Sequence, residues 1–177
     1  MRQLKRFTVA GILFVLITGT LSHFLYDWTE NNVIAGLFTP VNESVWEHMK
    51  LLFFPMLLYS FTGAMRFRKK YPCILPSLCL GILTGTLAIP ILFYSYMYII
   101  GKDIFLLDIG IFILSVIAAF IIAFKFTLSC KIKPYAVLLY CITALLFLCL
   151  VLFTYAPPNF KIFEDPAVHG IGVLTIK

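Results

Sequence analysis

Five apolar stretches, separated by shorter polar segments, divide the chain along its whole length. A helix needs about 20 predominantly apolar residues to cross the hydrocarbon core of a bilayer, and each stretch can supply them. The pattern therefore predicts an all-α fold, a polytopic bundle of five transmembrane helices in a single integral membrane domain, 1–177. The expected spans are 7–26, 46–65, 74–98, 104–124 and 134–155.

Composition supports this interpretation, because hydrophobic residues make up 62% of the 177 residues and charged residues only 12%. Soluble domains contain about 45–50% apolar and about 25% charged residues, so we expect the lipid bilayer as the main partner. The cysteines lie in or beside the apolar stretches without C-x-x-C or zinc-type spacing, which favours a role as small apolar fillers. They are Cys73, Cys79, Cys130, Cys141 and Cys149.

The basic residues concentrate before the first span and in the connections 66–70 and 125–133. Short segments rich in lysine and arginine stay in the cytoplasm, which predicts a multi-pass protein of the cell membrane with its N-terminus inside and its C-terminus outside. The loop 27–45 and the tail 156–177 are then extracytoplasmic. The net charge of +6 follows from this topology, and we expect no nucleic-acid partner because the basic residues do not share a soluble face.

The second span has ionisable residues at its start. Its uncharged part runs only from Leu51 to Met65, which is shorter than the about 20 residues that a crossing needs. The span must therefore carry Glu47, His48 and Lys50 into the membrane or to its edge. Ionisable groups at such depth cost a few kcal/mol each unless they find partners in a cavity or bundle interior, so they predict a functional site.

Helical spacing arranges these residues in two stripes. Glu43, Glu47 and Lys50 share one helix face, and His23 begins a second stripe if the first helix continues far enough. The main candidates for ligand binding or proton transfer are His23, Glu43, Glu47, His48 and Lys50. Secondary candidates are Asp27, Glu30, Asn42, Asp165 and His169.

Carboxylates and imidazoles in a confined site could bind a divalent metal such as zinc, iron or manganese. The expected metal ligands are His23, Glu43, Glu47 and His48, with Asp165 or His169 of the tail as possible additions. Alternatively, Glu43 and Glu47 relay protons with His48. A structural alternative is a capping box formed by Ser44 and Glu47, or an N-cap at Asn42. No motif of a named enzyme class is present, so catalytic residues stay unassigned.

The segment P-V-N-E-S-V-W-E-H-M-K at 40–50, with H-F-L-Y before it and F-T-Y-A-P-P-N-F-K-I-F-E-D-P after the fifth span, resembles a family of small bacterial integral membrane proteins known only as a domain of unknown function. The resemblance covers nearly the whole chain and implies topology without a reaction. A shorter segment, D-W-T-E-N-N, is similar to the calcium-binding D-W-x-E-x-N segment of alkaline ceramidases, which are membrane-embedded zinc hydrolases. Asp27, Trp28, Glu30 and Asn32 match it, but those enzymes have seven spans and a paired histidine motif that this chain lacks.

These observations predict an extracytoplasmic pocket of acids and histidines that binds a metal or a small ligand. One alternative is a component of proton-coupled or ion transport, for which a homo-oligomer would have to supply the repeat that one chain lacks. Another is an accessory subunit with a membrane partner, in which the charges only pair and cap helices. A ceramidase-like metal hydrolase is a further alternative.

Overall fold

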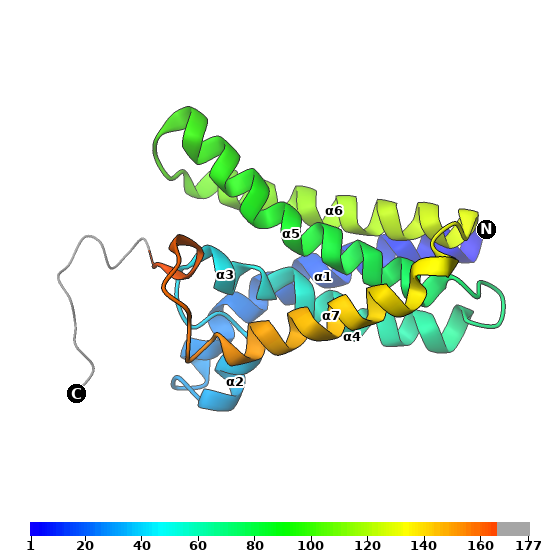
Figure 1. The fold of residues 1–177 in the computed structure, drawn as a ribbon, viewed down its shortest axis with the longest axis horizontal. Coiled ribbons are helices and arrows are strands. Elements are labelled where there is room, and N and C mark those ends of the chain that lie inside the picture. Colours follow the sequence, from blue (N-terminus) through cyan, green and yellow to red (C-terminus); the bar gives the residue numbers. More distant parts are fainter. Residues whose placement is uncertain (166–177) are drawn as a thin grey trace.

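The computed structural model describes residues 1–165, and the regular secondary structure of this part of the chain is entirely helical, without strands. The predicted all-α fold is thereby confirmed. The elements are α1 (Arg2–Trp28), α2 (Val33–Phe38), α3 (Val45–His48), α4 (Lys50–Phe67), α5 (Ile74–Ile100), α6 (Phe105–Ser129), η1 (Lys133–Tyr135), α7 (Ala136–Leu152) and η2 (Lys161–Phe163), as Figure 1 shows.

Four helical segments are long and apolar enough to cross a membrane: Arg2–Trp28, Ile74–Ile100, Phe105–Ser129 and Lys133–Leu152. The helix α4 is not among them, because its 18 residues include both Lys50 and Arg66. The predicted second span, 46–65, is also divided, since α3 ends at His48 and Met49 separates it from α4. Residues 1–165 therefore form an apolar helical protein with four candidate spans.

The helix α4 runs through the middle of the bundle, where it packs against α1 and α5. Its residues Leu52, Phe53 and Met56 have no exposed surface. The outer helices instead present apolar side chains outward, as on α7, where Val137, Leu145 and Leu152 are all more than half exposed. Apolar surface of this extent is unfavourable in water and suits contact with lipid chains, which supports a membrane protein.

The closest helix pair is α5 and α6, which run antiparallel and meet at small residues. A Cβ atom added at Gly81 would lie 2.5 Å from the carbonyl oxygen of Ala119, and one added at Gly85 would lie 2.7 Å from the Cβ of the same alanine. Glycine lets the two backbones approach where any side chain would hold them apart.

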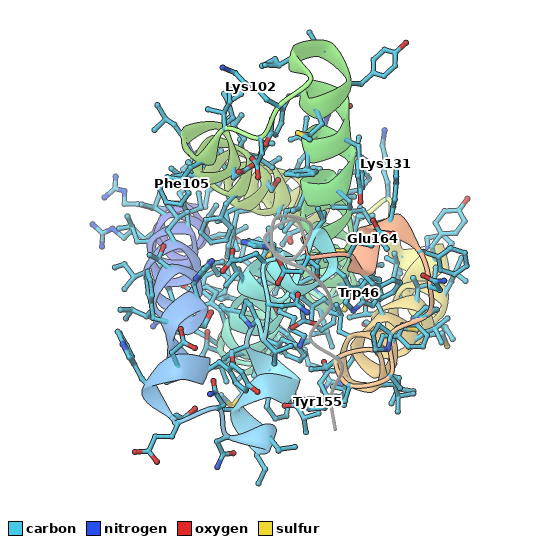
Figure 2. All side chains as sticks on the ribbon, turned by 90° about the vertical axis from the view of Figure 1, so that its left-hand side faces the viewer. Trp46, Lys102, Phe105, Lys131, Tyr155 and Glu164 are labelled. Atoms are coloured by element: carbon cyan, nitrogen blue, oxygen red, sulfur yellow. A yellow bond between two sulfur atoms is a disulfide. The ribbon has the colours of Figure 1, made fainter. Side chains whose placement is uncertain are left out.

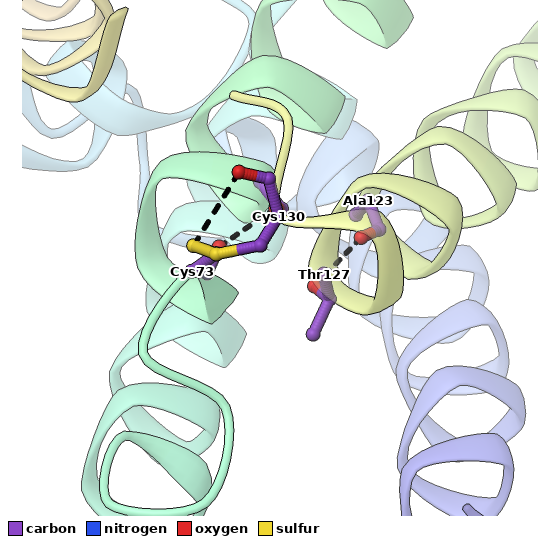
Figure 3. The surroundings of a disulfide bond; sticks show 5 residues. Cys73, Ala123, Thr127 and Cys130 are labelled. Carbon is purple, nitrogen blue, oxygen red and sulfur yellow. Dashed lines mark hydrogen bonds between the residues drawn. A yellow bond between two sulfur atoms is a disulfide. The ribbon is translucent and has the colours of Figure 1, made fainter. Parts of the chain in front are cut away.

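A disulfide bond between Cys73 and Cys130 joins the residue before α5 to the residue after α6, as Figure 3 shows. The prediction that all cysteines are apolar fillers is wrong for these two, whereas Cys79, Cys141 and Cys149 are free. The bonded residues are separated by 57 positions, and only the antiparallel packing of α5 on α6 brings them together.

The two ends of the bundle differ in charge. The N-terminus and the α4–α5 and α6–α7 connections lie at one end, here called the basic end, which carries Arg2, Lys5, Arg6, Arg66, Arg68, Lys69, Lys70, Lys131 and Lys133. The opposite end, here called the site end, carries α2, α3, η2 and the α5–α6 connection. Every candidate site residue within 1–165 lies at the site end.

Candidate metal site

A tight turn holds the residues that precede α3. The Oδ1 atom of Asn42 accepts a hydrogen bond from the backbone N–H of Ser44 at 3.0 Å, and Ser44 Oγ accepts one from the N–H of Glu47 at 3.3 Å. Only half of the predicted capping box therefore forms, with Ser44 as the N-cap of α3. The turn fixes the backbone on both sides of Glu43, whose side chain is half exposed.

The Glu43 carboxylate lies between two imidazoles from different helices. Its Oε2 atom is 3.5 Å from Nε2 of His23 on α1 and 3.4 Å from Nε2 of His48 on α3. The two histidine rings are 5.3 Å apart, and a ligand atom from each of the three residues lies within 4.8 Å of the others. The structure thus converges three potential metal ligands from two separated segments of the chain.

The tautomer of His48 follows from its second ring nitrogen. Nδ1 lies 2.9 Å from the backbone carbonyl oxygen of Ser44, which can only accept, so Nδ1 carries a proton and donates it. In the neutral ring, Nε2 then presents a lone pair to the carboxylate of Glu43. Two acceptors that face each other repel, so the arrangement calls for a cation between them, either a proton or a metal ion.

The surroundings of Glu43 and His48 shift the pKa values of both groups. Hydrogen bonds with His23 and His48 hold the pKa of Glu43 well below its usual value, against the opposing effect of burial. Burial alone would lower the pKa of His48, but its hydrogen bonds to Glu43 and Ser44 outweigh that effect and raise it. Glu43 is therefore ionised, and the protonated form of His48 is favoured beside it.

A second ionic cluster lies beside the first and uses the other predicted residues. Lys50 Nζ donates to Glu47 Oε2 at 2.7 Å and to Thr154 Oγ1 at 2.7 Å. It also donates to the backbone carbonyls of Gly36 at 2.9 Å and Thr39 at 3.3 Å. The side chains of Lys50 and Glu47 are 0% and 3% exposed, so this pair is closed to solvent.

Of the four predicted metal ligands, the structure brings three together and pairs the fourth, Glu47, with Lys50. The same carboxylate accepts a hydrogen bond from the N–H of Val41 at 3.0 Å, which ties the loop before α3 to the pair. The structure also separates the two acids that were expected to relay protons with His48. Glu43 faces the histidines, whereas Glu47 faces Lys50.

The remaining predicted residues have other surroundings. The helix α1 ends at Trp28, so the stripe expected from His23 through Asp27 does not extend to Glu30, and both of these acids are exposed. Asn32 caps α2, where its Oδ1 accepts from the N–H groups of Ile34 and Ala35. His169 lies outside the described residues.

The described part of the tail packs over the site end. Asp165 Oδ2 accepts a hydrogen bond from the backbone N–H of Glu43 at 3.4 Å, and the ring of Phe163 lies 4.7 Å from that of Trp46. Figure 2 looks onto this end, where Trp46 and the neighbouring Glu164 lie near each other. Asp165 is therefore beside the site, in contact with the backbone of one candidate ligand.

Two acids that the sequence interpretation left aside also approach the site. The hydroxyl of Tyr96 lies 2.8 Å from Asp103 Oδ1 and 2.7 Å from Asp108 Oδ1. Asp108 also acts electrostatically on His48, whose protonated form it favours. Asp108 lies in the first turn of α6, where an acid complements the helix dipole, at the same end of the bundle as His48 (Figure 1).

Comparison with known proteins gives a family but no activity. Residues 1–173 match a family of unknown function, DUF6512. No curated protein and no solved structure matches the chain.

Proposed function

The chain belongs to DUF6512, a family of unknown function, and we propose that it is a multi-pass membrane protein that binds one divalent metal ion at the site end through His23, Glu43 and His48. The basic end lies in the cytoplasm, because lysine- and arginine-rich short segments remain there. The helix α4 supplies the fifth crossing, with Leu52, Phe53 and Met56 buried in the bundle and with Leu58, Phe61 and Met65 exposed for contact with lipid. This places the metal site on the extracytoplasmic side.

The observation that carries the proposal is the spacing of the three ligand atoms. Zinc bonds to nitrogen at about 2.0–2.1 Å and to oxygen at about 2.0–2.2 Å, so tetrahedral geometry separates two such ligands by about 3.4 Å. The distances from Glu43 Oε2 to the two Nε2 atoms are 3.4 and 3.5 Å. Both distances match the separation of two ligands across a metal ion, and all three ligand atoms lie within 4.8 Å of one another.

The hydrogen bond from His48 Nδ1 to the Ser44 carbonyl gives further support. Metal-binding histidines characteristically donate their second N–H to a carbonyl or carboxylate, which fixes the tautomer and aims the lone pair at the metal. Nitrogen and carboxylate ligands suit zinc, and also iron or manganese. A bound metal would supply Lewis acidity, while the Asn42–Ser44 turn positions Glu43 and the partial exposure of all three residues leaves room for a further ligand.

The proposal is tested by elemental analysis of the full chain purified in detergent and loaded with zinc, iron or manganese. We expect one metal ion per chain, and its loss in Glu43→Ala and in His48→Ala. The matched control is Glu30→Ala, which removes an exposed acid at the same end and should retain the metal. Folded protein that takes up no metal, or equal uptake by all variants, would overturn the proposal.

A further inference from the structure

The Cys73–Cys130 disulfide lies at the basic end, where the proposed orientation makes a permanent disulfide unexpected. The two cysteines flank connections rich in cations: Arg66, Arg68, Lys69 and Lys70 precede Cys73, and Lys131 and Lys133 follow Cys130. Segments of this kind face the cytoplasm, where glutathione and thioredoxin systems keep most thiols reduced. The chain therefore holds two cysteines in bonding position within a reducing compartment.

The pairing is built into the fold rather than into a mobile terminus. Cys73 is the N-cap residue of α5 and Cys130 the C-cap residue of α6, and their Cα atoms are 5.4 Å apart, within the usual range for disulfides. The glycine contacts between α5 and α6 hold the helices together along their length. Reduction therefore leaves the two thiols close to each other and able to bond again.

We propose that Cys73 and Cys130 form a reversible thiol–disulfide pair that exchanges with the cytoplasmic thiol pool. The inference rests on the orientation given in the proposed function. In unstressed cells the pair is a dithiol, and oxidation closes a covalent ring through α5, the 101–104 connection and α6. The bond also joins the residue at which the chain arrives from α4 to the residue after which it continues toward α7.

The chemistry balances with a low-molecular-weight disulfide as oxidant. One cysteine thiolate attacks that disulfide, forms a mixed disulfide and releases one thiol; the second cysteine then displaces the other thiol. The protein loses two electrons and two protons, and the oxidant becomes two thiols. Reduction runs in reverse through Cys130, because its side chain is partly exposed whereas Cys73 is 1% exposed.

The test follows the redox state of the pair in living cells. A background variant with Cys79→Ala, Cys141→Ala and Cys149→Ala leaves only the pair to react. Cells are quenched in acid, and free thiols are then tagged with maleimide-linked polyethylene glycol and counted by gel shift. We expect two tags in unstressed cells, none after brief treatment with the thiol oxidant diamide, and two again after a reductant is added. Adding Cys73→Ser to the background should give one tag without formation of the intramolecular bond.

Two results would overturn the inference: a pair that is fully oxidised in unstressed cells, or a pair that keeps both tags after diamide. A reporter of membrane side inserted in the α4–α5 connection separates this failure from failure of the orientation. A permanent disulfide with a cytoplasmic reporter overturns the redox inference alone. A permanent disulfide with an external reporter overturns both the inference and the orientation, and neither result bears on metal binding at the other end.

Discussion

Glu47 and His48 are consecutive in the chain, yet they belong to two ionic clusters of opposite character. Glu47 pairs with Lys50 in a site closed to solvent, where the ammonium group has four oxygen partners. His48 faces Glu43 and His23 in a site where the side chain of Glu43 is 53% exposed. The first cluster contains its own cation, whereas the second is made of groups that accept and requires a proton or a metal to hold them together.

This difference in exposure indicates a structural role for the first cluster and a binding role for the second. A buried pair with all its partners inside the protein has nothing left to bind, and it connects α2, the loop before α3 and the end of α7. The partly exposed cluster, in contrast, is accessible to a cation from the surroundings, as the proposed metal site requires. Charged residues beside an apolar segment therefore do not share a role merely because they are adjacent in sequence.

The largest expected effect on stability comes from removing Lys50, the cation of the buried Glu47–Lys50 cluster. Lys50→Met leaves the Glu47 carboxylate buried without its partner, and breaking such pairs costs about 3–5 kcal/mol of folding free energy. Unfolding of the purified protein in detergent measures the loss. Lys5→Met, which removes an exposed lysine, is the control and should change little. Addition of Glu47→Leu to Lys50→Met should recover part of the loss; a single variant as stable as the natural chain would show that the pair has no structural role.

The next largest effect is expected in the partly exposed cluster of His23, Glu43 and His48, here called the open cluster. His48→Ala removes a metal ligand, and we expect affinity for zinc to fall by more than about 100-fold, since even loss of an outer-shell partner costs about 10–100-fold. Stability of the metal-free protein should fall much less than in Lys50→Met, because the side chain is partly exposed. Competition with a chromophoric chelator gives the affinity. Equal losses of stability in the two variants would remove the distinction between the clusters.

A smaller effect is expected at Ser44, which adjoins both clusters. Ser44→Ala removes the hydroxyl that caps α3, and loss of an N-cap costs about 1 kcal/mol. The carbonyl that orients His48 belongs to the backbone and remains, so zinc should still bind with moderately reduced affinity. Complete loss of zinc in Ser44→Ala would mean that the hydroxyl itself contributes to the site.

The smallest effect expected is a dependence on pH. Rising pH should lower the stability of the protein without zinc and should raise its affinity for zinc. The pKa of His48 is raised in the folded protein, so its contribution to stability is present below the unfolded value of 6.5 and is lost as pH rises through the folded pKa. Zinc competes with that proton, so its affinity should increase over the same window. Neutral histidine is the form that binds a metal, so zinc binds better as the proton leaves. Thermal unfolding between about pH 6 and pH 8, with and without zinc, measures both trends. His48→Ala should weaken both, and parallel trends with and without metal would contradict the site.

The sequence by itself determined the class of the protein and the distribution of its charges. Hydrophobic runs are a local property, and they correctly predicted an all-helical chain of membrane-compatible helices. Membership in an uncharacterised family was predicted by the resemblance of the segment at 40–50, and it is confirmed. The ionisable residues Glu43, Glu47, His48 and Lys50 could also be singled out, because charge beside an apolar run is visible without knowledge of the fold.

Only the tertiary structure decided which of these groups meet. Successive helix residues point about 100° apart, so Glu47 and His48 face different neighbours, and those neighbours depend on how the helices pack. Thr154 reaches Lys50 across 104 positions, and Cys73 reaches Cys130 across 57. The end of α1 at Trp28 leaves Glu30 outside the predicted stripe, and helix packing brings His23 to His48. Helix rotation arises from packing of the whole bundle, and no local pattern of residues encodes it.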